Sequence, residues 1–370
     1  MNAPRDLVYV ITGLNRAGAE LVCLSQATHF SRLGHRVGVI YLVDGHDDLV
    51  PEFEASGVAT ACLRMSSIWE LPQALWRCRN LLREWRPTVV HSHMIHATIL
   101  ISLIKWTLPE IKMIATAHSV HEGGRLLNFL QRITRSAPDL STNVSEEATR
   151  TYVAQRLFCA DRAKCIPNGI DATRFGFQDN RPAKSDGIFT YICVAQFRPE
   201  KNHITLLRAF SRVHGDHPNT QLMLLGAGPM LPECKVSAEA LGITNAVKFA
   251  GGNADVPTSL RDADAFVLVS NYEGFGIAAA EAMAVGLPIV GADVPGLREV
   301  IGRYGRLVCP TDIDAIAEAM EQCMLEEDRL SDRLARRHHI IKNFGSDSIF
   351  AKWESEYRRL GLSLTGQFSR

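Results

Sequence analysis

The sequence lacks an excess of charge of either sign, because 40 lysine and arginine residues are balanced by 40 aspartate and glutamate residues. A broad contact with a polyanion such as DNA is therefore disfavoured, although a local basic patch is compatible with this balance. The chain contains no apolar run of roughly 18 residues, and Met1–Asp6 is a short polar lead, which predicts neither a membrane span nor export. The nine cysteines are scattered without a Cys-x-x-Cys pair, as suits isolated thiols in a reducing compartment. We therefore expect a cytoplasmic protein with no nucleic-acid partner.

The chain is long enough for two hydrophobic cores, and it shows a repeating pattern of strands and helices. With 370 residues, 46% hydrophobic and 22% charged, it has the composition of a folded protein of more than one domain. Short runs rich in β-branched residues alternate with stretches of helical periodicity. The expected strands lie at Leu7–Gly13, Arg36–Leu42, Thr88–His91, Lys112–Ala117, Phe189–Val194, Gln221–Leu225, Ala246–Phe249, Ala265–Val269 and Pro288–Gly291. Strands separated by helices predict parallel sheets with right-handed crossovers.

The repeat is interrupted once, between Pro167 and Gly187, where glycine, asparagine and proline gather in the manner of a linker. We therefore predict an α/β protein with two Rossmann-like parallel-sheet domains, residues 1–170 and 185–345, that face a cleft. Ligands of such folds bind outside the carboxyl ends of the strands. A final helical stretch, residues 346–365, either closes the second domain or packs back onto the first.

The segment with the most chemical information follows the expected strand that ends at Ser270. Its notable members are Glu273, Gly274, Phe275, Gly276, Ile277 and Glu281. The two glycines permit a tight turn, and the alanine-rich stretch after them favours a helix. The first N–H groups of that helix would form an anion site suited to a phosphate. The simpler interpretation is a helix N-terminus with acidic residues that complement its dipole.

Two glutamates eight positions apart around this turn resemble the donor motif of the retaining glycosyltransferases of family 4. In that family the first glutamate approaches the transferred sugar and the second holds the ribose, so the resemblance assigns these roles to Glu273 and Glu281. It also assigns donor contacts to Gly274, Phe275, Gly276 and Ile277. The resemblance implies a GT-B fold in which residues 1–170 form the acceptor domain and residues 185–345 the nucleotide-sugar donor domain. It also implies a nucleotide-diphosphate-sugar donor, retention of configuration, and no cofactor or metal ion.

A second segment, Val194–Asn202, also lies between a strand and a helix. Lys201 is placed to meet a diphosphate as a point charge, or it is simply a solvated residue on a first helical turn. The family pattern keeps this lysine but has an arginine where this chain has Gln196. Gln196 donates hydrogen bonds without charge, so either Arg198 supplies the positive charge or the diphosphate is held less tightly.

The first half of the chain offers two further site residues. Residues 13–20 resemble the family's glycine loop near the donor phosphate and acceptor, with Ala17 and Gly18 in place of the usual paired glycines. His118 ends an expected strand and matches the family's histidine beside the reacting sugar, which assigns it a catalytic role with Glu273 and Lys201. A lone histidine there is otherwise a structural residue.

A metal centre and a dinucleotide site are both disfavoured by the motifs. The histidines at 91, 93, 96, 118 and 121 lack the cysteine or carboxylate spacing of a zinc site. The Asp262-Ala-Asp264 triplet precedes a strand and is interpreted as a surface turn. No G-x-G-x-x-G is present, because Leu231 stands in place of the third glycine after Gly226.

The family's tendencies suggest a UDP-linked hexose or N-acetylhexosamine as donor and a glycan or lipid-linked acceptor. Arginines at 77, 79, 83 and 86, interleaved with Trp76 and Trp85, would suit peripheral contact with the inner membrane surface, or form a solvated face. The alternatives left open are a sugar-nucleotide epimerase or a phosphorylase on the same fold, and a binding subunit without turnover, for which Gln196 is the one hint.

Overall fold

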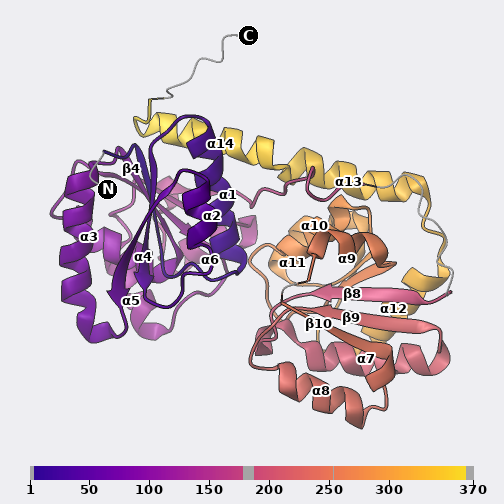
Figure 1. The fold of residues 1–370 in the computed structure, drawn as a ribbon. Coiled ribbons are helices and arrows are strands. Elements are labelled where there is room, and N and C mark those ends of the chain that lie inside the picture. The colour runs from indigo at the N-terminus through magenta and orange to yellow at the C-terminus, as the bar shows by residue number, and fades with distance from the viewer. Residues whose placement is uncertain (1–3, 178–186, 253, 364–370) are drawn as a thin grey trace. The chain divides into compact units, whose positions relative to one another are not determined.

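The computed structural model describes residues 4–177, 187–252 and 254–363. The chain divides into two compact units (Figure 1). Unit 1 comprises Met1–Asn168 and Ile349–Arg370, and unit 2 comprises Gly169–Ser348. The expected linker falls partly on residues 178–186, which lie outside the described residues. The predicted roles of the two domains remain predictions, because the division into units does not show which unit binds the donor and which binds the acceptor.

Unit 1 is built on a seven-stranded parallel sheet with the order β3-β2-β1-β4-β5-β6-β7. The strands are β1 Leu7–Ile11, β2 Val37–Val43, β3 Ala59–Met65, β4 Val89–His93, β5 Lys112–Ala117, β6 Leu140–Asn143 and β7 Ala163–Cys165. The helices are α1 Gly18–Arg32, α2 Val50–Ala55, α3 Leu71–Trp85, α4 Met94–Lys105, α5 Arg125–Thr134 and α6 Glu146–Ala154, with α14 Ser346–Arg359 added from the end of the chain.

Both faces of this sheet are covered, because alternate residues of a strand point to opposite faces. In β1, Leu7, Tyr9 and Ile11 pack in one core with side chains of α1, α2 and α14, whereas Val8 and Val10 pack in a second core with α3 and α4. Every residue of β1 is therefore buried.

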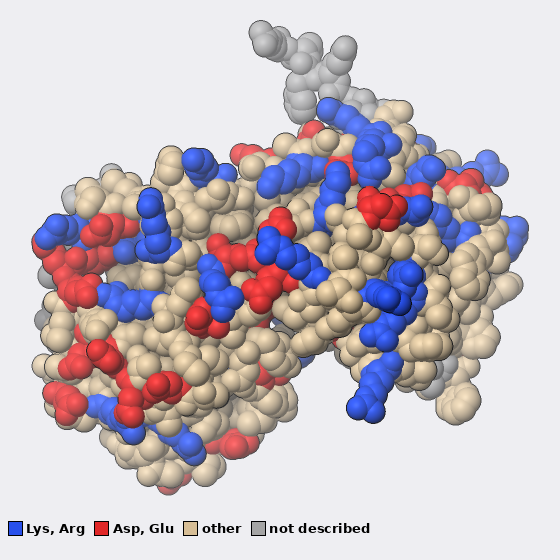
Figure 2. All heavy atoms as spheres, turned by 180° about the vertical axis from the view of Figure 1, so that it is seen from behind, with Lys and Arg blue, Asp and Glu red and all other residues tan. Residues whose placement is uncertain are grey.

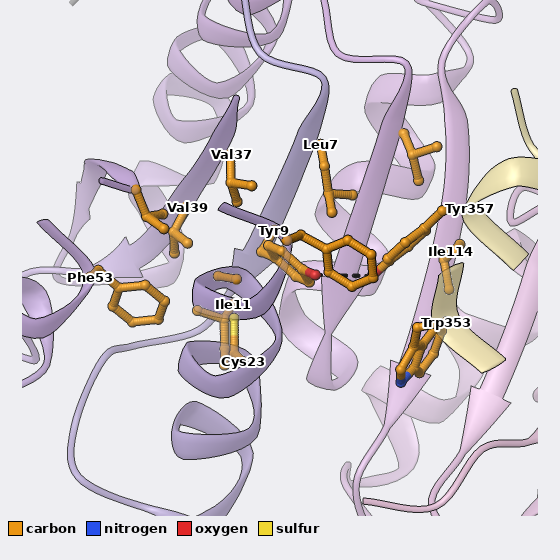
Figure 3. Packing of buried hydrophobic residues seen from close by; sticks show 14 of the residues in the cluster. Leu7, Tyr9, Ile11, Cys23, Val37, Val39, Phe53, Ile114, Trp353 and Tyr357 are labelled. Atoms are coloured by element: carbon orange, nitrogen blue, oxygen red, sulfur yellow. Dashed lines mark hydrogen bonds between the residues drawn. The ribbon is translucent and has the colours of Figure 1, made fainter. Parts of the chain in front are cut away.

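Helix α14 completes the first of these two cores. Trp353 and Tyr357 are fully buried beside Tyr9 and Ile114 (Figure 3). The hydroxyl of Tyr357 lies 3.1 Å from that of Tyr9 and 2.7 Å from Nδ1 of His91. Unit 1 thus takes part of its hydrophobic core from residues that follow the whole of unit 2 in the sequence.

Unit 2 contains a six-stranded parallel sheet with the order β10-β9-β8-β11-β12-β13. The strands are β8 Phe189–Val194, β9 Thr220–Leu225, β10 Val247–Gly251, β11 Ala265–Leu268, β12 Ile289–Ala292 and β13 Arg306–Val308. The helices are α7 His203–Asp216, α8 Leu231–Ala240, α9 Val256–Asp262, α10 Ile277–Ala284, α11 Pro295–Ile301, α12 Ile313–Leu325 and α13 Leu330–Phe344. The fold class predicted from the sequence, two parallel-sheet α/β domains, is confirmed.

The two segments through which the chain passes between the units are hydrogen-bonded to each other. Ile170 N–H donates to the carbonyl of Phe344 at 2.8 Å, and Ser346 N–H donates to the carbonyl of Ile170 at 3.0 Å. Arg337 of α13 also donates to the carbonyls of Ala172 and Phe175 at 3.1 and 2.9 Å. The start of the connection is therefore fixed to unit 2.

The surface is mixed in charge, with lysine and arginine side chains interspersed among acidic ones on the face shown in Figure 2, as the balanced composition leads one to expect. Within the described residues, no helix combines the length and the apolar content that crossing a bilayer requires.

Candidate active site

The candidate site in unit 2 lies where the sheet reverses its strand order. Strand β8 pairs with β9 on one side and β11 on the other, and the chain builds outward in both directions from this point. In open parallel sheets, loops that leave the carboxyl ends of two such strands separate and create room for a ligand. Here the two loops are joined by a backbone hydrogen bond of 2.8 Å from Asn271 N–H to the carbonyl of Glu200.

These loops bring together the lysine and the first glutamate that the sequence singles out. Lys201 Nζ lies 2.6 Å from Glu273 Oε1, and Ser270 Oγ donates to the same oxygen at 2.9 Å. The side chains are 22% and 10% exposed, so the ion pair is sheltered but open to one side. A sheltered charge pair interacts more strongly than a solvated one, which excludes the interpretation of Lys201 as an ordinary solvated residue.

Asn202, which is not among the site residues predicted from the sequence, fixes the position of this lysine. Its backbone is left-handed with a φ of 56°, a conformation that asparagine tolerates better than most residues. Its side-chain amide donates to the carbonyls of Val269 at 3.2 Å and Pro310 at 2.7 Å. Asn202 therefore joins the loops that follow β8, β11 and β13. An asparagine directly before the first turn of α7 is the only sequence signal that could have indicated it.

The glycine-rich turn forms the N-terminus of α10 in the way the sequence predicts. Gly276 has a φ of +93°, in the region that glycine alone adopts without strain. A methyl group on Gly296, in α11, would lie 2.6 to 2.7 Å from backbone atoms of Gly274 and Phe275. The turn is thus packed directly against α11, and the first N–H groups of α10 are left without partners inside their own helix.

Glu281 lies one turn into α10 and is partly buried. Burial raises its pKa to about 7, and the nearby Arg174 guanidinium counteracts part of this increase. A carboxyl group with a pKa near neutrality is typical of functional sites, but it is also what burial alone produces.

The remaining predicted donor residues of unit 2 lie on the same loops. The ring of Phe275 packs against Phe344 at 5.2 Å between centroids, so only its backbone is free to meet a ligand. Gln196 is partly buried and Arg198 is exposed, on either side of the buried Phe197. Which of these two residues serves a phosphate stays a prediction.

The two site residues predicted in unit 1 lie beyond the carboxyl ends of strands β1 and β5. Gly18 is the first residue of α1, after the loop that leaves β1. His118 directly follows β5, and its Nε2 lies 2.8 Å from Nδ1 of His93 at the end of β4. Burial lowers the pKa of His118 to about 4 and that of His93 well below its usual value. Both imidazoles are therefore neutral at physiological pH.

Glu122, which was not predicted from the sequence, holds the backbone of His118. The carboxylate of Glu122 accepts hydrogen bonds from the backbone N–H groups of His118 and Ile95, and burial raises its pKa to about 7. Its placement four residues after His118 in an irregular loop gives no sequence signal, because no helix or strand fixes that spacing.

Asp264 of the acidic triplet and His91 serve the fold. Asp264 Oδ2 accepts from the backbone N–H of Thr190 at 2.7 Å, and His91 hydrogen-bonds with Tyr357 and Thr116. In the part of the chain that the structure describes, no group of three or more His, Cys, Asp or Glu side chains is placed to hold a metal ion. Gly226 packs against Ala195, where a methyl group would lie 1.9 Å from the carbonyl oxygen, and so serves the contact between the β8 and β9 loops.

Comparison with known proteins decides the family. Residues 176–343 match the family described as glycosyl transferases group 1, and residues 16–174 match the one described as glycosyltransferase family 4. A glycogen synthase of Mycobacterium tuberculosis is 30% identical over 292 residues, which cover 72% of this chain and 67% of that protein. The chain belongs to glycosyltransferase family 4. It is a retaining glycosyltransferase that moves a sugar from a nucleotide-sugar donor to an acceptor.

Two further proteins resemble this glycosyltransferase over most of its length. EpsF of Bacillus subtilis, described as a putative glycosyltransferase, is 26% identical over 310 residues, which cover 79% of this chain and 80% of that protein. The structure of Anabaena HepE in complex with UDP and glucose has a TM-score of 0.83 at 18% identity, and covers 96% of this chain and 99% of HepE. The likeness to HepE shows that the fold is GT-B.

Proposed function

We propose that this glycosyltransferase transfers a hexose or an N-acetylhexosamine from a UDP-sugar to a glycan or lipid-linked acceptor in cell-surface polysaccharide assembly. Unit 2 would bind the donor and unit 1 the acceptor, as the predicted domain roles have it. The presence of UDP and glucose in the HepE structure supports the choice of donor, and the polysaccharide setting follows the tendencies of the family.

The main support for a donor site here is the sheltered Lys201–Glu273 ion pair. It lies on the loops that leave the neighbouring strands β8 and β11. A leaving nucleoside diphosphate gains negative charge as the sugar departs, and a fixed cation stabilises that charge without reorganisation of water. Lys201 would supply the cation, and the first N–H groups of α10 would add hydrogen bonds to the phosphates. Arg198 or Gln196 would complete the phosphate contacts.

The two glutamates would serve different parts of the donor. Glu273 Oε1 accepts hydrogen bonds from Lys201 and Ser270, and this carboxylate would lie beside the diphosphate and next to the transferred sugar. Glu281 would accept hydrogen bonds from the ribose hydroxyls, as the family resemblance implies. In unit 1, the neutral imidazole of His118, held by His93, would hydrogen-bond a sugar hydroxyl.

The test of the donor site is Lys201→Met combined with isothermal titration of UDP and GDP. Loss of one charge-assisted hydrogen bond of roughly 1.5–3 kcal/mol should weaken UDP binding roughly 10- to 100-fold. Because Lys201→Met leaves Glu273 without its partner, a Lys201→Met/Glu273→Gln variant serves as the control for local unfolding. Thermal unfolding with each nucleotide checks that the variants fold. Unchanged UDP affinity in both variants would remove Lys201 from the donor site.

Turnover separates the proposal from its alternatives. An epimerase would convert the UDP-sugar with no acceptor present, and a phosphorylase would require inorganic phosphate. A subunit that only binds would be stabilised by the donor but would not consume it. Glu273→Gln should abolish transfer in the proposed enzyme, whereas a binding subunit would keep its function.

A further inference from the structure

Helix α5 presents three large apolar residues to solvent, whereas its two fully buried residues are polar, which is unusual for a helix in a globular protein. Leu126, Phe129 and Ile133 are 64%, 56% and 54% exposed. They are spaced three and four residues apart and share one face of the helix. Gln131 and Thr134 are the fully buried residues of α5. We call the three exposed side chains the α5 face. An exposed apolar cluster of this kind marks an interaction site rather than ordinary surface.

Within its own segment, the α5 face is bordered by positive charge. Arg125, Arg132 and Arg135 are exposed, Arg132 Nε also donates to the carbonyl of Gln155 at 2.9 Å, and no aspartate or glutamate occurs between Gly123 and Pro138. The next acidic residue, Asp139, forms an ion pair with Lys105. An apolar strip with an arginine border is the pattern of helices that lie in the plane of an anionic bilayer.

A neighbouring element also exposes an aromatic side chain. Helix α4 packs beside α5, and Trp106, which ends α4, is 65% exposed. Tryptophan favours the boundary between headgroups and acyl chains. The six residues 119–124 connect His118 to α5, so a bilayer against α5 would lie next to the part of unit 1 where the acceptor is proposed to bind.

The arginine-rich helix predicted from the sequence, α3, is a weaker surface. Its Trp85 is buried, whereas Trp76 is 64% exposed. Arg77 and Arg79 are engaged with Leu63 and Thr107 of the same unit. Its exposed side is polar apart from Trp76, and α3 thus provides an internal comparison for α5.

We propose that the α5 face docks this glycosyltransferase on the surface of a bilayer that contains anionic lipids. The inference deepens the proposed function, since it rests on a lipid-linked acceptor. Charge complementarity favours lipid over a second copy of the chain: in a two-fold contact through α5, the arginine borders of the two copies would oppose each other with no acidic residue to pair with.

The experiment measures binding of the full chain to vesicles of phosphatidylglycerol and phosphatidylcholine, by co-sedimentation, with vesicles of phosphatidylcholine alone as the reference. We expect binding only to the anionic vesicles, and weaker binding as salt increases. Phe129→Ser/Ile133→Ser should lower the vesicle partition coefficient at least roughly tenfold, because two side chains no longer enter the interface. Trp76→Ser on α3, the matched control, should stay within about twofold of the unchanged protein.

Three results would overturn the proposal: no binding of the unchanged protein to anionic vesicles, equal binding to both vesicle types, or equal binding by the α5 variant. Gel filtration adds a fourth, because a dimer that becomes a monomer in Phe129→Ser/Ile133→Ser would show that a second copy covers the α5 face. Thermal stabilisation by UDP-sugars should be the same in all variants. If UDP-sugars fail to stabilise the unchanged protein while vesicle binding behaves as expected, the donor assignment fails and the docking surface stands.

Discussion

At the scale of single residues, the proposed donor site depends on ionisable groups held where water has limited access. Lys201 is paired with Glu273, and so would enter the proposed reaction already fixed in position. Burial raises the pKa of Glu281, and the nearby Arg174 guanidinium only partly offsets this increase. Glu281 therefore changes its ionisation near neutral pH.

Glu281 should make donor binding depend on pH. A ribose hydroxyl donates best to an ionised carboxylate, and the pKa of Glu281 is about 7, so UDP affinity should decrease as the pH falls through 7. Glu281→Gln should bind UDP more weakly at pH 8 and lose this dependence between about pH 6 and 8. Titrations of both proteins over that range test the prediction, and equal pH dependence would remove Glu281 from the ribose site.

The same raised pKa has a consequence for the ligand-free protein. In the unfolded chain the carboxyl ionises near its ordinary value of 4.5, while in the folded protein it stays protonated up to a higher pH. Its contribution to stability is therefore present below that ordinary value and is lost as the pH rises through about 7. Glu281→Gln should reduce this loss, as pH-dependent denaturation can show.

At the scale of elements, the turn that we propose binds the donor phosphates depends on how closely α10 and α11 approach. Gly296→Ala would place a methyl group against the backbone of Gly274 and Phe275 at 2.6 to 2.7 Å. The turn or α11 must then move. We expect a loss of about 1–3 kcal/mol in stability together with weaker UDP binding, measured by denaturation and titration. Gly215→Ala in α7, where a methyl group meets nothing within 4 Å, is the control and should stabilise by about 0.5–1 kcal/mol. Normal UDP binding in Gly296→Ala would show that the turn tolerates displacement.

The strands that the sequence predicts are those whose periodicity is unambiguous. Leu7–Gly13 and Phe189–Val194 are dense in buried β-branched and aromatic residues, and both become central strands, β1 and β8. Strands β3, β6, β7 and β13 were not predicted. Strand β6 reads Leu-Ser-Thr-Asn, and its Thr142 is satisfied by Thr116 of β5 at 2.6 Å. Such a strand is stabilised by its neighbours rather than by its own propensity.

The candidate site could be predicted only as far as its motifs extend. Glu273, Lys201 and Gly276 were identified from local patterns, and the structure places all three on adjoining loops of unit 2. Asn202 and His93 were not assigned a role, since each acts through a contact with residues distant in the sequence. Tertiary contacts of this kind leave no periodic signal.

At the scale of the whole molecule, unit 1 consists of two chain segments separated by unit 2. Trp353→Ala in α14 should destabilise unit 1 by about 3–5 kcal/mol, because a large buried side chain is lost from its core. Hydrogen exchange should show faster exchange in β1, β4 and α1 while β8 to β13 keep their protection. Lys352→Ala, on the exposed side of the same helix, should change stability by less than about 0.5 kcal/mol. Equal loss of protection in both units would show that they unfold as one.

The return of α14 also determines the order in which the molecule can be completed during synthesis. The strands of unit 1 leave the ribosome first, but Trp353 and Tyr357, which fill the core beside Tyr9, are translated only after the residues of unit 2. All of Gly169–Ser348 has been made by then. We therefore expect unit 2 to complete its fold before unit 1. Until α14 has been made, one face of the unit 1 sheet stays uncovered, and the nascent chain needs protection from aggregation there.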